Sequence, residues 1–296
     1  MIEFTVLGGY LGAGKTTLLN HLLRHNEGIR IGLLINDFGA INIDADLIES
    51  QQDNQVNLTN GCVCCTMTDG FFEAVESLQQ LPAPPEHIVV EASGVADVAQ
   101  LSQYGSLPGL HLAGVMVVAD AETVQAKADD KYVAQTVRRQ LAAADVVILN
   151  KVDLVDAQAT ESLHKWLQTV TAAQVITAEF GKVPAAVLLG SYQRDVRPAG
   201  HGHESYATWH CDTGILAQDQ VEAFVDALSQ LSLLRAKGLV PLIDGRVLEL
   251  QKVGQRTSSH IRADVGRPRG DVVAIDLAQH LPTAQLEALA ARYLRA

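Results

Sequence analysis

The chain has 296 residues, of which 48% are hydrophobic and 19% are charged, and its formal net charge is -12. This mixture is typical of a globular protein with a buried core, and the length predicts about two domains. The negative charge argues against nucleic acid as a partner, and the lack of a basic leader or a long apolar run predicts a cytoplasmic protein that does not contact a membrane.

Short runs rich in Val, Ile and Leu alternate with longer helical patterns in the first half, as parallel strands and crossover helices do. We expect a doubly wound, mostly parallel α/β domain over residues 1–190. The predicted strands are Phe4–Leu7, Ile31–Ile35, His87–Glu91, Ala113–Ala119, Val146–Leu149 and Val175–Thr177, and the predicted helices are Lys15–Arg24, Met67–Gln80, Tyr132–Ala144 and Ala159–Thr169.

The first predicted strand leads directly into a phosphate-binding sequence. Residues 9–16 match G-x-x-x-x-G-K-[ST] between a strand and a helix, which is the context that this motif requires. Lys15 is expected to reach the β- and γ-phosphates of a nucleotide, and Thr16 to bind Mg²⁺. The predicted nucleotide contacts in this segment are Gly9, Gly12, Ala13, Gly14, Lys15, Thr16 and Thr17.

A polar segment, Asn36-Asp37-Phe38-Gly39, follows the second predicted strand. This is where a switch that senses the γ-phosphate is expected. Asp37 can coordinate water, Mg²⁺ or a second metal. A simple Asn-Asp turn is the alternative interpretation.

Three of the four cysteines, Cys62, Cys64 and Cys65, are crowded between predicted elements. In a reducing cytosol they are thiols, and soft thiolates favour zinc or a similarly thiophilic ion. Three sulfurs leave one position of a tetrahedral ion open to water, Asp37, a histidine or a receiving protein, which suits metal transfer. Packed small side chains or a redox pair is the alternative.

The third predicted strand ends in Glu91-Ala92-Ser93-Gly94. Its position at the carboxyl edge of the sheet predicts that Glu91 lies near the nucleotide's Mg²⁺ and that the Gly94 N–H faces the γ-phosphate. A helix cap is the alternative role for Glu91.

The fifth predicted strand ends in Asn150-Lys151-Val152-Asp153. The Asp153 carboxylate can accept hydrogen bonds from both N1–H and the exocyclic amine of guanine, and adenine offers no such donor pair. Asn150, Lys151 and Asp153 therefore predict GTP rather than ATP. An ordinary cap of the next helix is the alternative.

Residues 191–204 are rich in Gly, Pro, Arg and His and predict a linker. Residues 205–296 predict a small α+β domain, in which Cys211 is interpreted as a packed core thiol. Its predicted elements are strands at Tyr206–Cys211, Gly238–Ile243, Val247–Lys252 and Val272–Ile275, a helix near Gln218–Gln230 and a last helix from Thr283.

Together and in this order, these motifs resemble the CobW-like subfamily of the G3E GTPases, whose mark is the Cys-x-Cys-Cys loop. The segment Leu234–Gly238 resembles the start of that subfamily's C-terminal domain. The resemblance implies a weak GTPase that binds zinc or cobalt at Cys62, Cys64 and Cys65 and serves a client metalloprotein. Asp37 stands where the family usually has Glu, so its role as a ligand does not follow from the resemblance.

The cysteines lie between the two predicted switch segments, so we expect GTP and metal binding to be coupled and reciprocal. No arginine is placed like a built-in finger, which predicts slow GTP hydrolysis, raised by a homodimer or by the client. Two other functions fit the P-loop: a small-molecule kinase, and a metal sensor or buffer that does not hydrolyse nucleotide.

Overall fold

The chain divides into two compact units, Met1–Leu189 and Gly190–Ala296. The computed structural model describes residues 1–26, 28–35, 69–189, 206–262 and 270–295. Several predicted features lie outside these described residues: Asp37, Cys62, Cys64, Cys65 and the linker 191–204.

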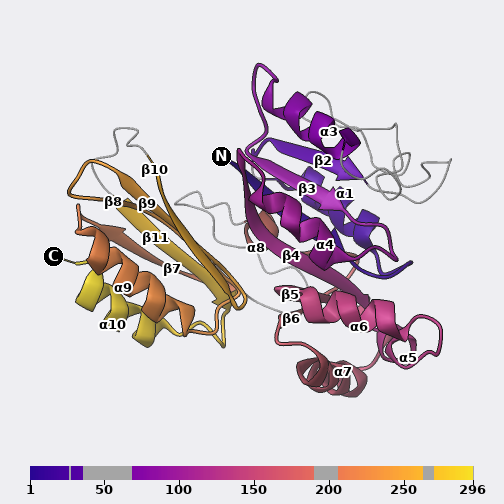
Figure 1. The fold of residues 1–296 in the computed structure, drawn as a ribbon. Coiled ribbons are helices and arrows are strands. Elements are labelled where there is room, and N and C mark those ends of the chain that lie inside the picture. The colour runs from indigo at the N-terminus through magenta and orange to yellow at the C-terminus, as the bar shows by residue number, and fades with distance from the viewer. Residues whose placement is uncertain (27, 36–68, 190–205, 263–269, 296) are drawn as a thin grey trace. The chain divides into compact units, whose positions relative to one another are not determined.

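A parallel six-stranded sheet in the order β2-β3-β1-β4-β5-β6 forms the centre of the first unit (Figure 1). Because β1 lies between β3 and β4, the segments that follow these three strands leave the same edge of the sheet side by side. The strands are β1 (Ile2–Gly8), β2 (Ile31–Ile35), β3 (His87–Glu91), β4 (Leu110–Asp120), β5 (Val146–Asn150) and β6 (Gln174–Ala178).

Helices bury the apolar side chains of this sheet. Phe4 and Val6 of β1 belong to one buried cluster, which also contains Leu78, Leu141 and Leu167 from three different helices. Within each of these helices the buried apolar residues recur at helical spacing, so the helix presents one apolar face to the core. The helices are α1 (Lys15–Arg24), α3 (Asp69–Gln79), α4 (Val98–Ser102), α5 (Val124–Ala128), α6 (Ala134–Ala143), α7 (Ala157–Val170) and α8 (Ala185–Leu189), with short 3-10 turns η1 (Gln103–Ser106) and η2 (Val152–Leu154).

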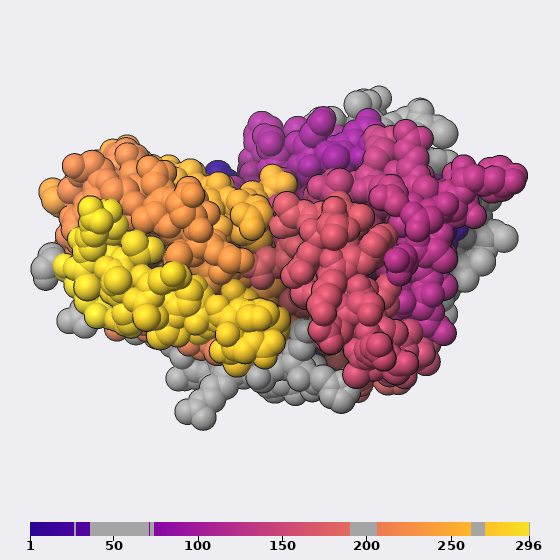
Figure 2. All heavy atoms as spheres, turned by 90° about the horizontal axis from the view of Figure 1, so that it is seen from below, coloured from indigo at the N-terminus to yellow at the C-terminus, as the bar shows by residue number. Residues whose placement is uncertain are grey.

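The second unit is an antiparallel five-stranded sheet in the order β10-β9-β8-β11-β7. Helices α9 and α10 lie side by side on this unit, and Figure 2 shows the yellow α10 directly against the orange α9. Its elements are β7 (Tyr206–Thr213), α9 (Gln218–Ser229), β8 (Arg235–Pro241), β9 (Val247–Val253), β10 (Arg256–Arg262), β11 (Gly270–Leu277) and α10 (Thr283–Tyr293).

Two polar contacts fasten these helices to the sheet. The Trp209 Nε1–H of β7 donates to Glu287 Oε1 of α10 at 2.8 Å. The Lys252 Nζ of β9 donates to the Ser229 carbonyl at the end of α9 at 3.2 Å, and burial lowers the pKa of this lysine. A cation at a helix C-terminus satisfies a carbonyl that has no partner within the helix.

The predicted fold class, a mostly parallel α/β domain followed by a smaller α+β domain, is confirmed. Strand β10 was not predicted, and β8 begins three residues before the predicted strand, at Arg235. Residues 235–238 of the segment that resembles the start of the family's C-terminal domain lie in β8, the middle strand of the second sheet. Cys211 is only 2% exposed, and burial raises the pKa of its thiol, as a packed core cysteine requires.

No helix within the described residues has both the length and the apolar character needed to cross a bilayer.

Candidate nucleotide site

Residues 9–16, the P-loop, connect β1 to α1 through backbone that only glycine adopts easily. Gly9 has φ 136° and Gly14 has φ 101°. A Cβ at Gly9 would lie 2.3 Å from the Val118 carbonyl oxygen, and one at Gly14 would lie 2.3 Å from Asn150 Nδ2. Both positions therefore need glycine for conformation and for space.

Lys15 and Thr16, at the start of α1, lie beside the ends of two strands. The Lys15 Nζ donates to the Gly9 carbonyl at 3.0 Å, and the residue is 9% exposed. The Thr16 hydroxyl donates to Glu91 Oε1 at 3.4 Å, and Glu91 is 3% exposed at the end of β3. A hydroxyl beside a carboxylate is a pair of hard oxygen ligands, and this pair fits Mg²⁺.

Asn150, at the end of β5, joins the P-loop to the segment that follows β6. Its Nδ2 donates to the Ala13 carbonyl at 3.0 Å, and its Oδ1 accepts from the Gly181 N–H at 3.0 Å. Asn150 is 1% exposed, so both ends of its amide are satisfied inside the protein. The predicted base-recognition motif is thereby attached to the predicted phosphate loop.

The next residue of the motif is held by a buried carboxylate. Lys151 has φ 64°, a left-handed backbone, and its Nζ lies 2.6 Å from Asp120 Oδ2 at the end of β4. The side chain of Asp120 is 8% exposed, which shields this ion pair from solvent. Asp153 follows in η2 and is exposed, so a ligand can reach its carboxylate.

Gly94 lies directly against the P-loop. A Cβ on Gly94 would come within 2.8 Å of the Leu11 backbone nitrogen and 2.6 Å of its side chain. The turn is closed by the Ala96 N–H, which donates to the Ser93 carbonyl at 2.9 Å. Two segments that were predicted to contact phosphate are thus in contact with each other.

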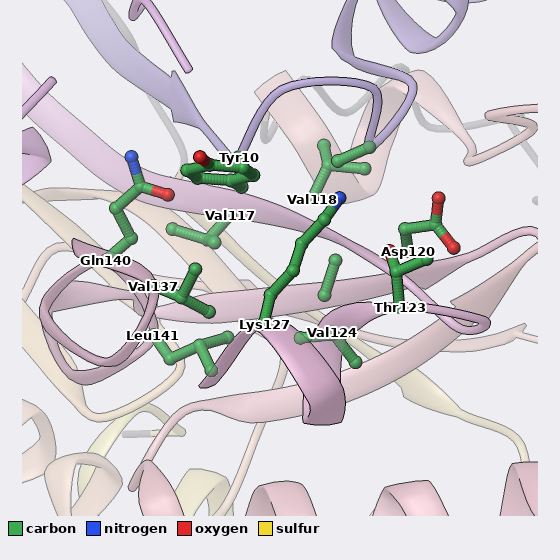
Figure 3. A pocket seen from close by; sticks show the side chains of 12 residues that line it. Tyr10, Val117, Val118, Asp120, Thr123, Val124, Lys127, Val137, Gln140 and Leu141 are labelled. Atoms are coloured by element: carbon green, nitrogen blue, oxygen red, sulfur yellow. The ribbon is translucent and has the colours of Figure 1, made fainter. Parts of the chain in front are cut away.

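A small pocket of about 20 Å³ lies beside the P-loop, between Tyr10 and the helices α5 and α6. Figure 3 shows Lys127 of α5 with Val137, Gln140 and Leu141 of α6 around this space. The Lys127 Nζ lies 5.1 Å from the centre of the Tyr10 ring and donates to the Leu11 carbonyl at 3.3 Å. Space of this size holds about one water molecule, so the pocket is a packing gap behind the P-loop and not the nucleotide site.

Sequence reasoning missed several residues of this site. Asp120 and Gly181 each follow a predicted strand whose carboxyl end lies beside β5, and that position alone was the available signal. No sequence pattern distinguished Phe180. The structure distinguishes it, because it has φ 53° and is 60% exposed. Within the described residues, Lys151 and Phe180 are the non-glycine residues with positive φ.

No cluster of three or more His, Cys, Asp or Glu side chains within the described residues could hold a metal ion. The predicted metal ligands Cys62, Cys64, Cys65 and Asp37 lie outside that part of the chain.

Comparison with known proteins places the chain in a family. Residues 3–178 match the family model "CobW/HypB/UreG, nucleotide-binding domain". The zinc chaperone CobW of Sinorhizobium sp is 32% identical in an alignment that covers 88% of this chain and 87% of that protein. The zinc-regulated GTPase metalloprotein activator 1 of Schizosaccharomyces pombe is 29% identical over 62% of this chain and 47% of its own length.

Among solved structures, the Zn(II)-bound YjiA GTPase from E. coli is similar over 99% of this chain and 98% of that one, with 23% identity and a TM-score of 0.48. The family match covers more than half of the chain, and the CobW relative extends the similarity into the second unit. The resemblance stated from the motifs is confirmed: the chain belongs to the CobW/HypB/UreG family, as a CobW-like member of the G3E GTPases.

Proposed function

We propose that the protein is a cytoplasmic, GTP-hydrolysing metallochaperone that binds zinc, or another thiophilic transition metal, and delivers it to a client metalloprotein. The observation that supports the nucleotide part of the proposal is the amide of Asn150, which belongs to the predicted guanine motif and is hydrogen-bonded to Ala13 of the P-loop and to Gly181 after β6. The metal half is supported by the sequence of Cys62, Cys64 and Cys65 and by a 32% identical relative that is named a zinc chaperone.

In this proposal the P-loop N–H groups hold the α- and β-phosphates of GTP, and Lys15 holds the β- and γ-oxygens. Thr16 and Glu91 would hold Mg²⁺, which neutralises charge on the phosphates when it is bound. Water attacks the γ-phosphorus, the bond from that phosphorus to the bridging oxygen breaks, and GDP and inorganic phosphate leave. The Gly94 N–H faces the γ-phosphate, and Asp37 is the candidate for orienting the water.

The proposal is tested first by steady-state GTP hydrolysis with and without one equivalent of Zn²⁺, using the wild type and Cys64→Ala. We expect Zn²⁺ to change the rate of the wild type, because in the sequence the cysteines lie between the two segments predicted to respond to the γ-phosphate. The variant should hydrolyse GTP at the metal-free rate under both conditions.

Equal rates in all four reactions would contradict metal coupling and leave a GTPase whose cysteines have another role. Tight zinc binding without any hydrolysis would instead identify a metal sensor or buffer. Phosphate transfer to a small molecule would identify a kinase.

We also propose that Phe180 stacks on the guanine base. The residue is 60% exposed, with the Lys182 Nζ 5.6 Å from the centre of its ring. Its backbone is left-handed, a conformation that costs a non-glycine residue of order 1 kcal/mol or more. The next residue, Gly181, is bonded to Asn150, and the preceding strand pairs Ala178 with Asn150. Phe180 therefore lies beside the guanine motif, where its aromatic ring can stack on the base.

Phe180→Gly should weaken GTP and GDP binding equally, by about tenfold, since stacking of a base on an aromatic ring contributes roughly 1–3 kcal/mol. Glycine adopts the same backbone without strain, so the melting temperature should not fall. Isothermal titration and thermal denaturation measure these effects. Tyr132→Ala removes a more exposed aromatic of the same unit and serves as the control; unchanged affinities in Phe180→Gly would refute the stacking.

A further inference from the structure

Gln140 is a buried polar residue of α6 that the nucleotide chemistry above does not use. It is 2% exposed, and its Nε2 donates to the carbonyl of Gly94 at 3.2 Å and to that of Ala96 at 3.0 Å. The side-chain amide of Gln140 thus donates twice to the same turn, which contains Gly94. A buried amide with both donors satisfied in this way fixes the orientation of the groups it contacts.

The neighbouring residue on α6 holds the other end of the same turn. Arg139 pairs with Asp97 Oδ2, while Asp97 Oδ1 accepts from the Ala99 and Gln100 N–H groups as the N-cap of α4. Two consecutive α6 side chains therefore clamp residues 94–97. Arg139 is 62% exposed, so the buried Gln140 contributes more of the restraint.

On its opposite side the turn packs closely against Leu11 of the P-loop. Gly94 lies so close to Leu11 that a Cβ would approach the Leu11 backbone nitrogen to 2.8 Å. Lys127 of α5 holds the carbonyl of the same leucine at 3.3 Å. The Gly94 turn is consequently enclosed between the P-loop, which α5 restrains, and α6.

We infer that Gln140 is a positioning residue that lets the site discriminate GTP from GDP. The inference rests on the proposed function, because it concerns the γ-phosphate. The Gly94 N–H shares a peptide plane with the Ser93 carbonyl, which accepts from the Ala96 N–H at 2.9 Å. Gln140 holds the carbonyls of Gly94 and Ala96 in the same turn. The turn is therefore fixed from both sides, and the Gly94 N–H is ready to meet a γ-phosphate. GDP lacks that phosphate and makes no contact with this N–H. A γ-phosphate adds one more restraint to the turn, and Gln140 transmits it to α6, so α6 should be better ordered with GTP than with GDP.

Gln140→Met tests this, because methionine has nearly the same length but donates no hydrogen bond. We expect the affinity for a non-hydrolysable GTP analogue to fall about tenfold, as the loss of two buried hydrogen bonds allows, while the affinity for GDP changes less than about twofold. Isothermal titration of both nucleotides into the full chain gives the ratio directly.

Val137→Ala is the matched control. Val137 lies one turn earlier on α6, is 4% exposed and lines the same packing gap, but it makes no contact with the Gly94 turn through a hydrogen bond. Both variants should lower the melting temperature through lost packing or bonding. Only Gln140→Met should change the ratio of the two affinities, which a purely structural role for Gln140 would leave unchanged.

A second measurement needs no variant. Amide hydrogen exchange of the wild type should show slower exchange over residues 134–143 with the GTP analogue than with GDP. Equal protection of α6 in the two states, or an unchanged affinity ratio in a folded Gln140→Met, would overturn the inference. A wild type that bound neither nucleotide would instead overturn the proposed function.

Discussion

Lys15→Ala is expected to weaken the binding of GTP and GDP by on the order of 100-fold and to reduce hydrolysis below detection. The Lys15 Nζ lies 3.0 Å from the Gly9 carbonyl, inside the turn that the P-loop makes, with 9% of the residue exposed. When a nucleotide binds in this turn, the ammonium group of Lys15 gives up its hydrogen bond to the Gly9 carbonyl and donates to phosphate oxygens instead. Each charge-assisted hydrogen bond to those oxygens contributes roughly 1.5–3 kcal/mol, and alanine supplies none.

Binding is measured by isothermal titration and hydrolysis by phosphate release. Lys165→Ala is the control, because it removes the same charge from an exposed position of α7, where Lys165 pairs with Glu161 at 2.6 Å. A fully exposed pair of this kind contributes little to stability because solvent screens it, so the control should behave as the wild type does. Wild-type affinity in Lys15→Ala would show that nucleotide does not bind at this loop.

Asp153→Asn is expected to change the base that the protein selects. The Asp153 carboxylate can accept two hydrogen bonds from guanine, whereas an asparagine amide presents one acceptor and one donor to the same edge. Xanthine carries a carbonyl where guanine carries its amine, so the variant fits xanthine. We expect GTP binding to fall by about 100-fold, as the loss of bonds to a charged acceptor predicts, and XTP binding to exceed it.

Competition titrations with GTP, XTP and ATP measure this change. The control is Asp156→Asn, three residues further on, where Asp156 caps α7 by accepting from the Ala159 N–H at 2.7 Å. Asparagine is an equally good N-cap, so this variant should keep its preference for GTP. An unchanged preference in Asp153→Asn would remove Asp153 from the base site and leave guanine selection to other groups.

The first sheet was predictable because its strands are buried on both faces and read as continuous apolar runs. His87–Glu91, for example, is buried at every position. Strand β10 was not predictable in this way, since Arg256–Arg262 reads as polar and becomes a strand only through its pairing with β9. The short helices α4, α5 and α8 have five residues each, which is too few for a helical period to be recognised.

The candidate site divides in the same way. Lys15, Glu91 and Asn150 sit in local motifs next to predicted strands, so the sequence was enough to select them. Gln140 and Phe180 can be recognised as candidate site residues only from the contacts made in the folded structure. A glutamine in an amphipathic helix is expected to face solvent, and only the distant turn at Gly94 accounts for its burial here.

The strand order also determines when the protein can acquire its native form during synthesis. β1 is made first, but its neighbours β3 and β4 begin at His87 and Leu110. At a synthesis rate of roughly 5–20 residues per second, about 5–20 s pass between the synthesis of β1 and that of its second neighbour, β4. During that interval it needs protection from other nascent chains. The hydrogen bond from Gly181 to Asn150 can form only after residue 181 has been made, so the site described above is completed late in translation.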